Sequence, residues 1–200
     1  MRIMIDAMGG DHAPYEIVKG ALEAMKEYGH EIVLVGDSAA ISDSLKKLGH
    51  SDVPAGIEIV HASQVVTMED DGTAVMRSKK DSSMVVGLKM LKEGQADAFV
   101  SAGSSGAILV GGQTIVGRIK GIKRPPLAPI IPTETGMSLI IDCGANVDAK
   151  AENLVQFAQM GSIYMENVMG VKNPKVAIVN IGAEEEKGNA LVKETIPKLH

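Results

Sequence analysis

Two hydrophobic spacings alternate along the chain. Short apolar runs, which are too brief for a helix and suit buried strands, are followed by longer segments with apolar residues at helical spacing. The predicted strands lie at residues 3–5, 32–35, 57–60, 98–100, 127–131, 138–141 and 176–179. The predicted helices lie at residues 14–28, about 39–48, between 83 and 94, 107–119, 151–169 and after 189. Residues 66–72 are mostly polar and predict irregular structure.

This alternation predicts an α/β fold. Strands that alternate with helices favour a mainly parallel sheet with helices on both faces. We expect a single α/β domain over residues 1–200, incomplete at the C-terminus because no closing element follows the last helix.

Residues 96–119 contain the most informative unit of the chain, a strand followed by a loop and a helix. A short strand at 98–100 is followed by a Gly/Ser loop at 101–106 and by an uncharged apolar segment. In such a unit the N–H groups of the loop and of the first helical turn point at one spot, where the helix dipole adds positive charge. Phosphate is the natural occupant, although a tight turn of small residues explains the loop equally well. The loop lacks the spacing of a Walker A motif or of a dinucleotide fingerprint.

Composition narrows the function classes. A net charge of −5 and 2% aromatic residues argue against nucleic-acid binding, because single strands stack on aromatic side chains. The one cysteine, Cys143, excludes an internal disulfide and fits a reducing cytosol. The uncharged stretch at 98–117 is interrupted by polar residues and glycines, so we expect it to be buried rather than membrane-spanning. The apolar run at the N-terminus is too short for a signal peptide.

Polar residues and glycines gather where four predicted strands end. The loops lie at residues 6–12, 101–106, 142–146 and 180–182. Because ligands bind beyond the carboxyl ends of parallel strands, four such loops on one edge predict a site. His12 suits proton transfer near neutral pH or phosphate binding, or it merely starts a helix. Asp6 suits the orientation of a basic group, or loop support and capping.

The remaining candidates also have structural interpretations. Ser82 and Ser83 suit helix N-caps. Lys187 is either a cation positioned by the 180–182 loop or a partner of a nearby glutamate at helical spacing. The cations at 77–80 either neutralise a phosphate or form a solvated face. Cys143 is expected to be a small buried filler. No spacing of His, Cys, Asp and Glu indicates a metal site.

Six stretches in order along the chain have the character of family motifs. They are DAMGGDHAP at 6–14, RSKKDSS at 77–83, SAGSSGA at 101–107, RP at 124–125, DCGAN at 142–146 and NIGAEEEKGN at 180–189. Together they resemble the phosphate acyltransferase family of bacterial phospholipid synthesis, and the resemblance covers the whole chain. Two departures stand out. Ser104-Ser105 replace the family's usual Asn-Thr, and the family continues beyond residue 200 with a further site motif.

The resemblance implies a three-layer α/β/α sandwich with a mainly parallel sheet, similar to isocitrate/isopropylmalate dehydrogenase and phosphotransacetylase. It implies acyl transfer from acyl-carrier protein to inorganic phosphate, giving acyl phosphate without a cofactor. It further implies a cytoplasmic homodimer, with peripheral association of the complete protein at the inner membrane surface. A non-catalytic phosphate- or carrier-binding fragment and a phosphotransacetylase-like or dehydrogenase-like enzyme of the same fold are the alternatives.

From this resemblance we assign hypothetical roles to single residues. Lys187 would stabilise the oxyanion or phosphate charge, His12 would steer protons on phosphate, and Asp6 completes the catalytic set. Phosphate binding is assigned to Ser101, Gly103, Ser104, Ser105, Gly106, Lys80, Ser82 and Ser83. Support of the substrate site is assigned to Asp142, Asn146, Asn180 and Asn189. An acidic carrier needs a local basic patch on a chain of negative net charge. We assign this docking patch to Arg118, Lys120, Lys123 and Arg124, with Arg77, Lys79 and Lys80 as the rival patch.

Overall fold

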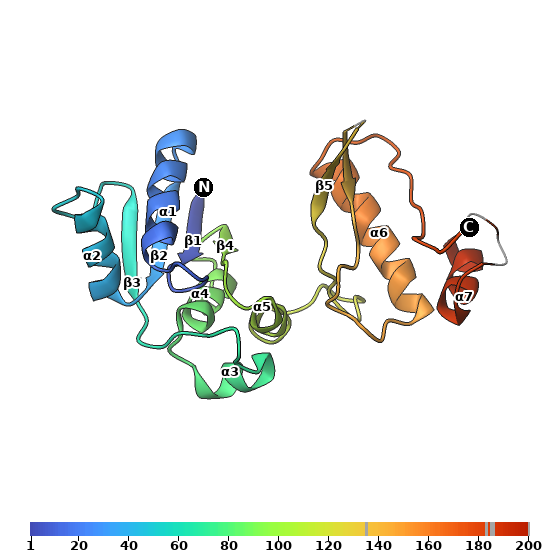
Figure 1. The fold of residues 1–200 in the computed structure, drawn as a ribbon, viewed down its shortest axis with the longest axis horizontal. Coiled ribbons are helices and arrows are strands. Elements are labelled where there is room, and N and C mark those ends of the chain that lie inside the picture. The colour runs from blue at the N-terminus through green and yellow to red at the C-terminus, as the bar shows by residue number, and fades with distance from the viewer. Residues whose placement is uncertain (135, 183, 185–186, 200) are drawn as a thin grey trace. The chain divides into compact units, whose positions relative to one another are not determined.

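The computed structural model describes residues 1–134, 136–182, 184 and 187–199. It contains two compact units, Met1–Arg118 and Ile119–His200, and each is described by itself (Figure 1). The single α/β domain expected over residues 1–200 stays a prediction.

The first unit is built on a four-stranded parallel sheet. Its strands are β1 (Arg2–Asp6), β2 (Glu31–Gly36), β3 (Ile57–His61) and β4 (Ala98–Val100), in the order β3-β2-β1-β4. β1 pairs with β2 on one side and with β4 on the other, so Ile5 lies beside both Leu34 and Val100. The four strands predicted for this part of the chain are confirmed, and each extends by at most one residue at either end.

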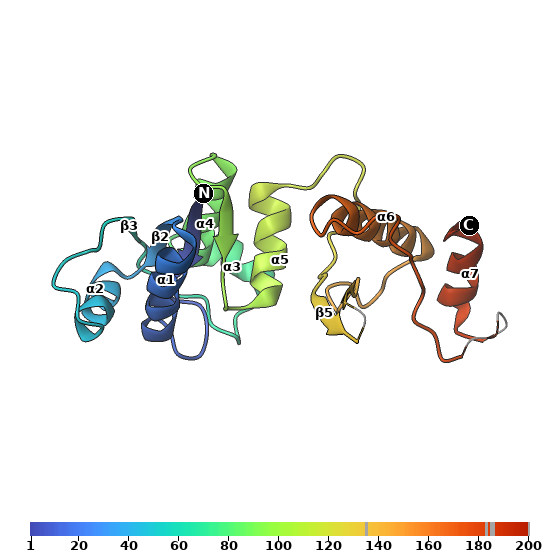
Figure 2. The same ribbon diagram turned by 90° about the horizontal axis from the view of Figure 1, so that it is seen from above.

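Helices cover both faces of this sheet, as seen from above in Figure 2. They are α1 (Tyr15–Tyr28) and α2 (Ser38–Lys47) on one face and α4 (Ser83–Lys92) on the other. Because side chains alternate along a strand, Ile32 and Leu34 of β2 pack with α1 and α2, whereas Val33 and Val35 pack with residues of α4. The arrangement is the predicted three-layer α/β/α sandwich.

A short helix that the sequence did not predict follows the irregular segment 66–71. Helix α3 (Gly72–Ser78) begins where the Asp71 side chain accepts hydrogen bonds from the N–H groups of Thr73 and Ala74. This N-cap satisfies N–H donors that have no partner inside the helix. The irregular structure predicted for residues 66–72 is confirmed up to residue 71. Only Gly72 of that segment lies in the helix, and helical structure over residues 73–78 was not predicted.

The helix predicted at 107–119 is present with different ends. Helix α5 (Ser105–Gly111) begins two residues earlier, and the π-helical segment η1 (Gly112–Val116) continues it. Ala107 packs with Val75 of α3 and with Val85 and Leu88 of α4 in one buried cluster. This third cluster, in addition to the two on the sheet faces, fixes α5 against α3 and α4.

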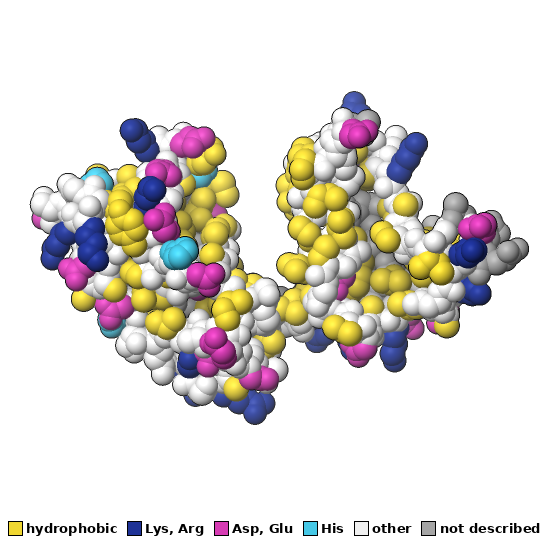
Figure 3. Space-filling model, viewed as in Figure 1, with side chains coloured by type: hydrophobic (Ala, Val, Ile, Leu, Met, Phe, Trp, Pro, Cys, Tyr) yellow, Lys and Arg dark blue, Asp and Glu magenta, His cyan; other side chains and the backbone are white. Residues whose placement is uncertain are grey.

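The second unit combines a hairpin with two helices. Strands β5 (Ile130–Thr133) and β6 (Gly136–Leu139) pair antiparallel, and α6 (Ala151–Asn167) and α7 (Ala190–Leu199) follow. Thr135, where the gap between the strands predicted at 127–131 and 138–141 indicates a turn, lies outside the described residues. Hydrophobic side chains remain on the surface of this unit (Figure 3), among them Ile131, Met137 and Ile163.

The strand predicted at 176–179 is wrong. Among the described residues these four pair with no strand, and Val176 and Val179 are 51% and 89% exposed. A strand needs a neighbour to satisfy its backbone N–H and C=O groups, so an apolar run alone does not produce one. Val176 and Ile178 instead line a cavity of about 620 Å³ with residues of α6 and α7.

Among the residues that the structure describes, none of the helices has both the length and the apolarity needed to cross a membrane.

Candidate functional site

The loops after β1 and β4 meet through one hydrogen-bonded group. Asp6 ends β1 with only 1% of its surface exposed, and Ser101 follows β4. The Ser101 hydroxyl donates to Asp6 Oδ2 at 2.7 Å, and its oxygen accepts the Gly103 N–H at 3.0 Å. Asp6 Oδ1 accepts the Met8 N–H at 3.2 Å. Since β1 and β4 are adjacent and parallel, this contact is the one that the sheet topology predicts for their carboxyl ends.

The two backbones are also in close contact at Gly9. A Cβ atom built on Gly9 would lie 2.6 Å from Asp6 Oδ2 and 2.9 Å from both the Gly103 nitrogen and Ser101 Oγ. Any larger side chain at this position would therefore push the carboxylate away from the serine or separate the loops. The absence of a side chain at Gly9 therefore allows the two loops to approach closely.

The Gly/Ser loop leads directly into α5. Ser104 is buried, and its Oγ caps the helix by accepting the Ala107 N–H at 3.3 Å. Ser105 and Gly106 are exposed, and their backbone N–H groups have no acceptor within the described part of the chain. The loop can therefore offer two N–H donors and the Ser105 hydroxyl to an anion, while Ser101 and Ser104 hold the backbone.

Helix α3 forms a wall of this loop, which the sequence interpretation missed. A Cβ atom built on Gly72 would lie 2.9 Å from the Gly106 carbonyl oxygen and 3.1 Å from the Ala107 nitrogen. The N-terminus of α3 thus rests on the first turn of α5, backbone against backbone. The signal that could have found α3 is Asp71 immediately before Gly72, since aspartate is a preferred N-cap.

The cations before α4 have different environments. Lys79 donates to Asp70 Oδ2 at 2.5 Å and to the Val65 carbonyl at 2.8 Å. The Lys79 hydrogen bond, helped by the Thr67 N–H, lowers the pKa of Asp70. Lys80 is exposed and has no charged partner among the described residues. Only Lys80 of this pair is therefore available to a phosphate.

The serines of the same motif are structural. Ser82 is completely buried and caps α4 by accepting the Val85 N–H at 3.3 Å, and Ser83 is 1% exposed. The N-cap interpretation is confirmed for Ser82, whereas Ser83 is the first residue of the helix and does not cap it. Their assignment to phosphate binding stays a prediction.

His12 lies in the loop between β1 and α1 and is exposed. Its backbone carbonyl accepts the Glu16 N–H at 3.2 Å, and its ring has no hydrogen-bond partner among the described residues. The imidazole is therefore accessible for proton exchange with a bound ligand, and no partner fixes its orientation.

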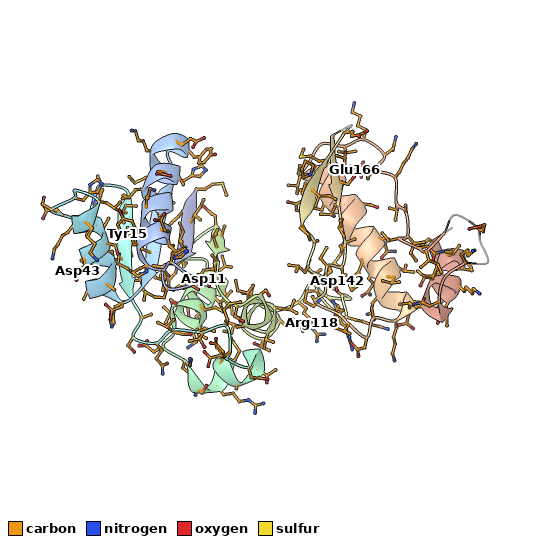
Figure 4. The ribbon with its side chains drawn as sticks, viewed as in Figure 1. Asp11, Tyr15, Asp43, Arg118, Asp142 and Glu166 are labelled. Atoms are coloured by element: carbon orange, nitrogen blue, oxygen red, sulfur yellow. The ribbon has the colours of Figure 1, made fainter. Side chains whose placement is uncertain are left out.

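Asp142 organises the corresponding loop of the second unit (Figure 4). Its carboxylate accepts the N–H groups of Leu127 at 2.6 Å, Asn146 at 2.7 Å and Ala145 at 3.3 Å. Partial burial raises the pKa of Asp142, but these hydrogen bonds outweigh it, so the net pKa is lowered. Asn146 extends the network to the Pro125 carbonyl at 3.1 Å. Both residues order the backbone of this loop.

The last motif is ordered by two asparagines. Asn180 donates to the Lys187 carbonyl at 3.1 Å, and Asn189 Oδ1 accepts the Val192 N–H at 3.0 Å at the start of α7. Lys187 is exposed and forms an ion pair with Glu184 at 3.9 Å. The pairing that the spacing allowed is thus present. The loops 142–146 and 180–182 belong to the second unit, and their convergence with the loops of the first stays a prediction.

The cations assigned to carrier docking are partly neutralised. Lys123 forms an ion pair with Glu152, and Arg124 pairs with Asp148 at 2.6 Å. The hydrogen bond from each cation lowers the pKa of its acidic partner. Lys120 is exposed and has no charged partner in the described ranges. Arg118 is exposed and is the last residue of the first unit (Figure 4).

Cys143 corrects the sequence interpretation. It is exposed rather than a buried filler. Its backbone N–H bonds to the Leu127 carbonyl at 2.9 Å, and its Sγ lies 3.9 Å from the Ile140 carbonyl oxygen. The described residues contain no group of three His, Cys, Asp or Glu side chains placed to hold a metal ion.

Comparison with known proteins identifies close relatives. The family model of fatty acid synthesis proteins matches residues 1–200. A phosphate acyltransferase of Alkaliphilus oremlandii (strain OhILAs) is 55% identical over 195 residues, which are 97% of this chain and 57% of the relative. The phosphate acyltransferase of Clostridioides difficile (strain 630) is 49% identical over 201 residues, 100% of this chain and 58% of the relative. The chain therefore spans a little under three fifths of these curated relatives.

A solved structure supports the fold. The chain resembles the crystal structure of a phosphotransacetylase from Streptococcus pyogenes with a TM-score of 0.71 and 18% identity, over 100% of this chain and 65% of that one. At this identity the likeness shows the shared α/β fold alone.

Proposed function

We propose, from the premise that this chain belongs to the fatty acid synthesis protein family, that the complete protein is a phosphate acyltransferase. It would transfer a fatty acyl group from acyl-carrier protein to inorganic phosphate and so supply acyl phosphate for phospholipid synthesis. The observation that supports this most is the match of the whole chain, at 49–55% identity, to proteins that bear this activity as their name.

The reaction needs no nucleophile from the protein. A phosphate oxygen attacks the thioester carbonyl, a C–O bond forms, the C–S bond breaks, and the carrier thiolate takes the proton released by phosphate. The enzyme must hold the phosphate against the thioester and stabilise the oxyanion that develops on the carbonyl oxygen.

The loop at 101–106 is proposed to hold the phosphate. The exposed N–H groups of Ser105 and Gly106, which lack acceptors among the described residues, and the Ser105 hydroxyl support this role. Lys80 would add a positive charge. His12, whose ring is accessible, would exchange the proton on phosphate.

Lys187 is proposed to stabilise the developing oxyanion. Its ion pair with Glu184 is long and exposed, so the ammonium group can leave it at little cost. Asn180 and Asn189 support the backbone on either side of Lys187.

Docking of the acidic carrier is proposed to involve Lys120, whose charge is unpaired in the described part of the chain. Charge reversal by Lys120→Glu should raise the Michaelis constant for acyl-carrier protein and flatten its salt dependence, without changing that for phosphate. If only Lys80→Glu raises the Michaelis constant for acyl-carrier protein, the carrier docks on the rival patch that contains Lys80. The homodimer and the peripheral membrane association stay predictions.

One assay tests the activity. The complete protein is mixed with acyl-carrier thioester and phosphate, and acyl phosphate is trapped with hydroxylamine as the hydroxamate. Hydroxamate that depends on phosphate is expected, and its absence would reject the function. The 200-residue chain in the same assay separates an active enzyme from a fragment that binds without turnover, the alternative supported by its partial coverage of the relatives.

A further inference from the structure

We propose that Asp6 and Ser101 act together as positioning residues that set the geometry of the phosphate loop, so that Asp6 itself does not touch the substrate. The inference rests on the proposed function, because it concerns the loop assigned to phosphate. Its basis is the pair of hydrogen bonds that connects two neighbouring strands of the sheet through one serine hydroxyl.

The direction of each hydrogen bond follows from the chemistry of its groups. An ionised carboxylate only accepts, so the Ser101 hydroxyl must donate its single proton to Asp6 Oδ2, 2.7 Å away. A lone pair of Ser101 Oγ then accepts the Gly103 N–H at 3.0 Å. The proton of Ser101 is committed, so Ser101 has none to offer a phosphate.

The carboxylate is held from its other side as well. Asp6 Oδ1 accepts the Met8 N–H at 3.2 Å, and the side chain is 1% exposed. A Cβ atom built on Gly9 would lie within 3 Å of Asp6 Oδ2, Ser101 Oγ and the Gly103 nitrogen, so there is no room for a side chain at this position. A side chain held in this way keeps Ser101, and through it Gly103, in a fixed place.

The fixed Gly103 determines where the ligand-binding donors lie. Ser104, Ser105 and Gly106 follow it without a break, and α5 begins at Ser105. A shift of the Gly103 N–H therefore moves the Ser105 and Gly106 N–H groups relative to Lys80. Because hydrogen bonds weaken steeply with distance and angle, phosphate affinity should depend on Ser101 although Ser101 does not contact phosphate.

Ser101→Ala removes both hydrogen bonds and leaves the overall fold to the hydrophobic core. We expect its dissociation constant for inorganic phosphate to rise about tenfold, which corresponds to a loss of about 1.4 kcal/mol of binding free energy. In the complete enzyme the Michaelis constant for phosphate should rise by a similar factor, while kcat and the constant for acyl-carrier protein stay within about twofold. Ser101→Thr, which keeps the hydroxyl, should restore phosphate binding.

The matched control is Ser44→Ala. Ser44 is buried in α2, and its Oγ donates to the Ala40 carbonyl at 2.8 Å, a serine hydroxyl bond in the same unit but in a helix that carries none of the residues assigned to phosphate. Its loss should leave the dissociation constant for phosphate unchanged. If Ser101→Ala fails to fold, Asp6→Asn takes its place. It preserves shape but replaces the charge-assisted bond by a neutral one, about half as strong, so we expect about a threefold rise in that constant.

Phosphate affinity is measured from the increase of the melting temperature with phosphate concentration, which requires no turnover. Wild-type affinity in a folded Ser101→Ala or Asp6→Asn variant would overturn the positioning role and leave the phosphate site intact. An equal loss in Ser44→Ala would reduce the effect to general destabilisation and overturn it as well. A wild-type protein without phosphate-dependent stabilisation would reject the phosphate loop itself, while the hydroxylamine assay reports separately on the proposed activity.

Discussion

Replacing Gly72 by alanine tests whether α3 supports the candidate site. The added methyl group would lie 2.9 Å from the Gly106 carbonyl oxygen, 3.0 Å from its carbon and 3.1 Å from the Ala107 nitrogen. Ordinary van der Waals contact begins about half an ångström farther out. All three neighbours are backbone atoms, so no side-chain rotation relieves the contact. Either α3 or the first turn of α5 must move.

The energetic cost follows from two opposing effects. Overpacking of this kind costs about 1–3 kcal/mol, whereas alanine in a helix gains about 0.5–1 kcal/mol over glycine. We therefore expect Gly72→Ala to lower the free energy of unfolding by about 1–2 kcal/mol. Because the displaced turn contains the Ser105 and Gly106 N–H groups, phosphate protection should fall as well.

Urea unfolding with and without phosphate measures both effects. The control is Gly20→Ala in α1, where an added Cβ atom meets nothing within 4 Å. This variant should be more stable by about 0.5–1 kcal/mol and bind phosphate unchanged. The reasoning is refuted if Gly72→Ala is as stable as the wild type and is protected by phosphate to the same extent.

Three further predictions concern the second unit. Lys187→Ala in the complete protein should lower turnover about 10²–10³-fold, as a lost oxyanion donor does, with unchanged urea stability; near-normal turnover would leave Lys187 a surface pairing residue. Cys143→Ala should retain turnover, and isolation of an acyl thioester on Cys143 would contradict this. Asp142 has a lowered folded-state pKa, so its stabilisation is present above the unfolded pKa of about 3.9 and is lost as the pH falls through the folded value. Between pH 7 and pH 3, Asp142→Asn should therefore lose less stability than the wild type, and equal losses would count against the assignment.

The parts of the fold that the sequence predicted well are those in which local pattern and tertiary packing agree. The apolar strands of the first unit pair with one another, and α1 ends at Gly29 with a φ of +66°, a left-handed conformation that glycine adopts without strain. Residues 176–179 have the same apolar pattern, but none of the described residues forms a strand that pairs with them. Pairing between strands is a property of the whole sheet, which a short window of sequence does not contain.

The candidate site shows the same limit. The sequence pointed to the loops 6–12 and 101–106, and the parallel pairing of β1 with β4 brings them together. The wall formed by α3 was missed, because its contact with the first turn of α5 depends on the absence of a side chain at Gly72 rather than on a chemically distinctive residue. Cys143 was misplaced because a small residue beside a glycine suits a turn as well as a core.

The two aspartates that seemed most suited to chemistry have a common structural use. Asp6 accepts hydrogen bonds from the Met8 N–H and the Ser101 hydroxyl, and Asp142 accepts three backbone N–H groups around its own loop. In both cases the carboxylate holds backbone or side-chain donors in place. Among the described residues, the groups without a partner that are assigned to the phosphate include the Ser105 and Gly106 N–H groups, the Ser105 hydroxyl and the Lys80 ammonium group. These are donors and a cation, which bind an oxyanion, and they suit a reaction in which the nucleophile arrives as phosphate.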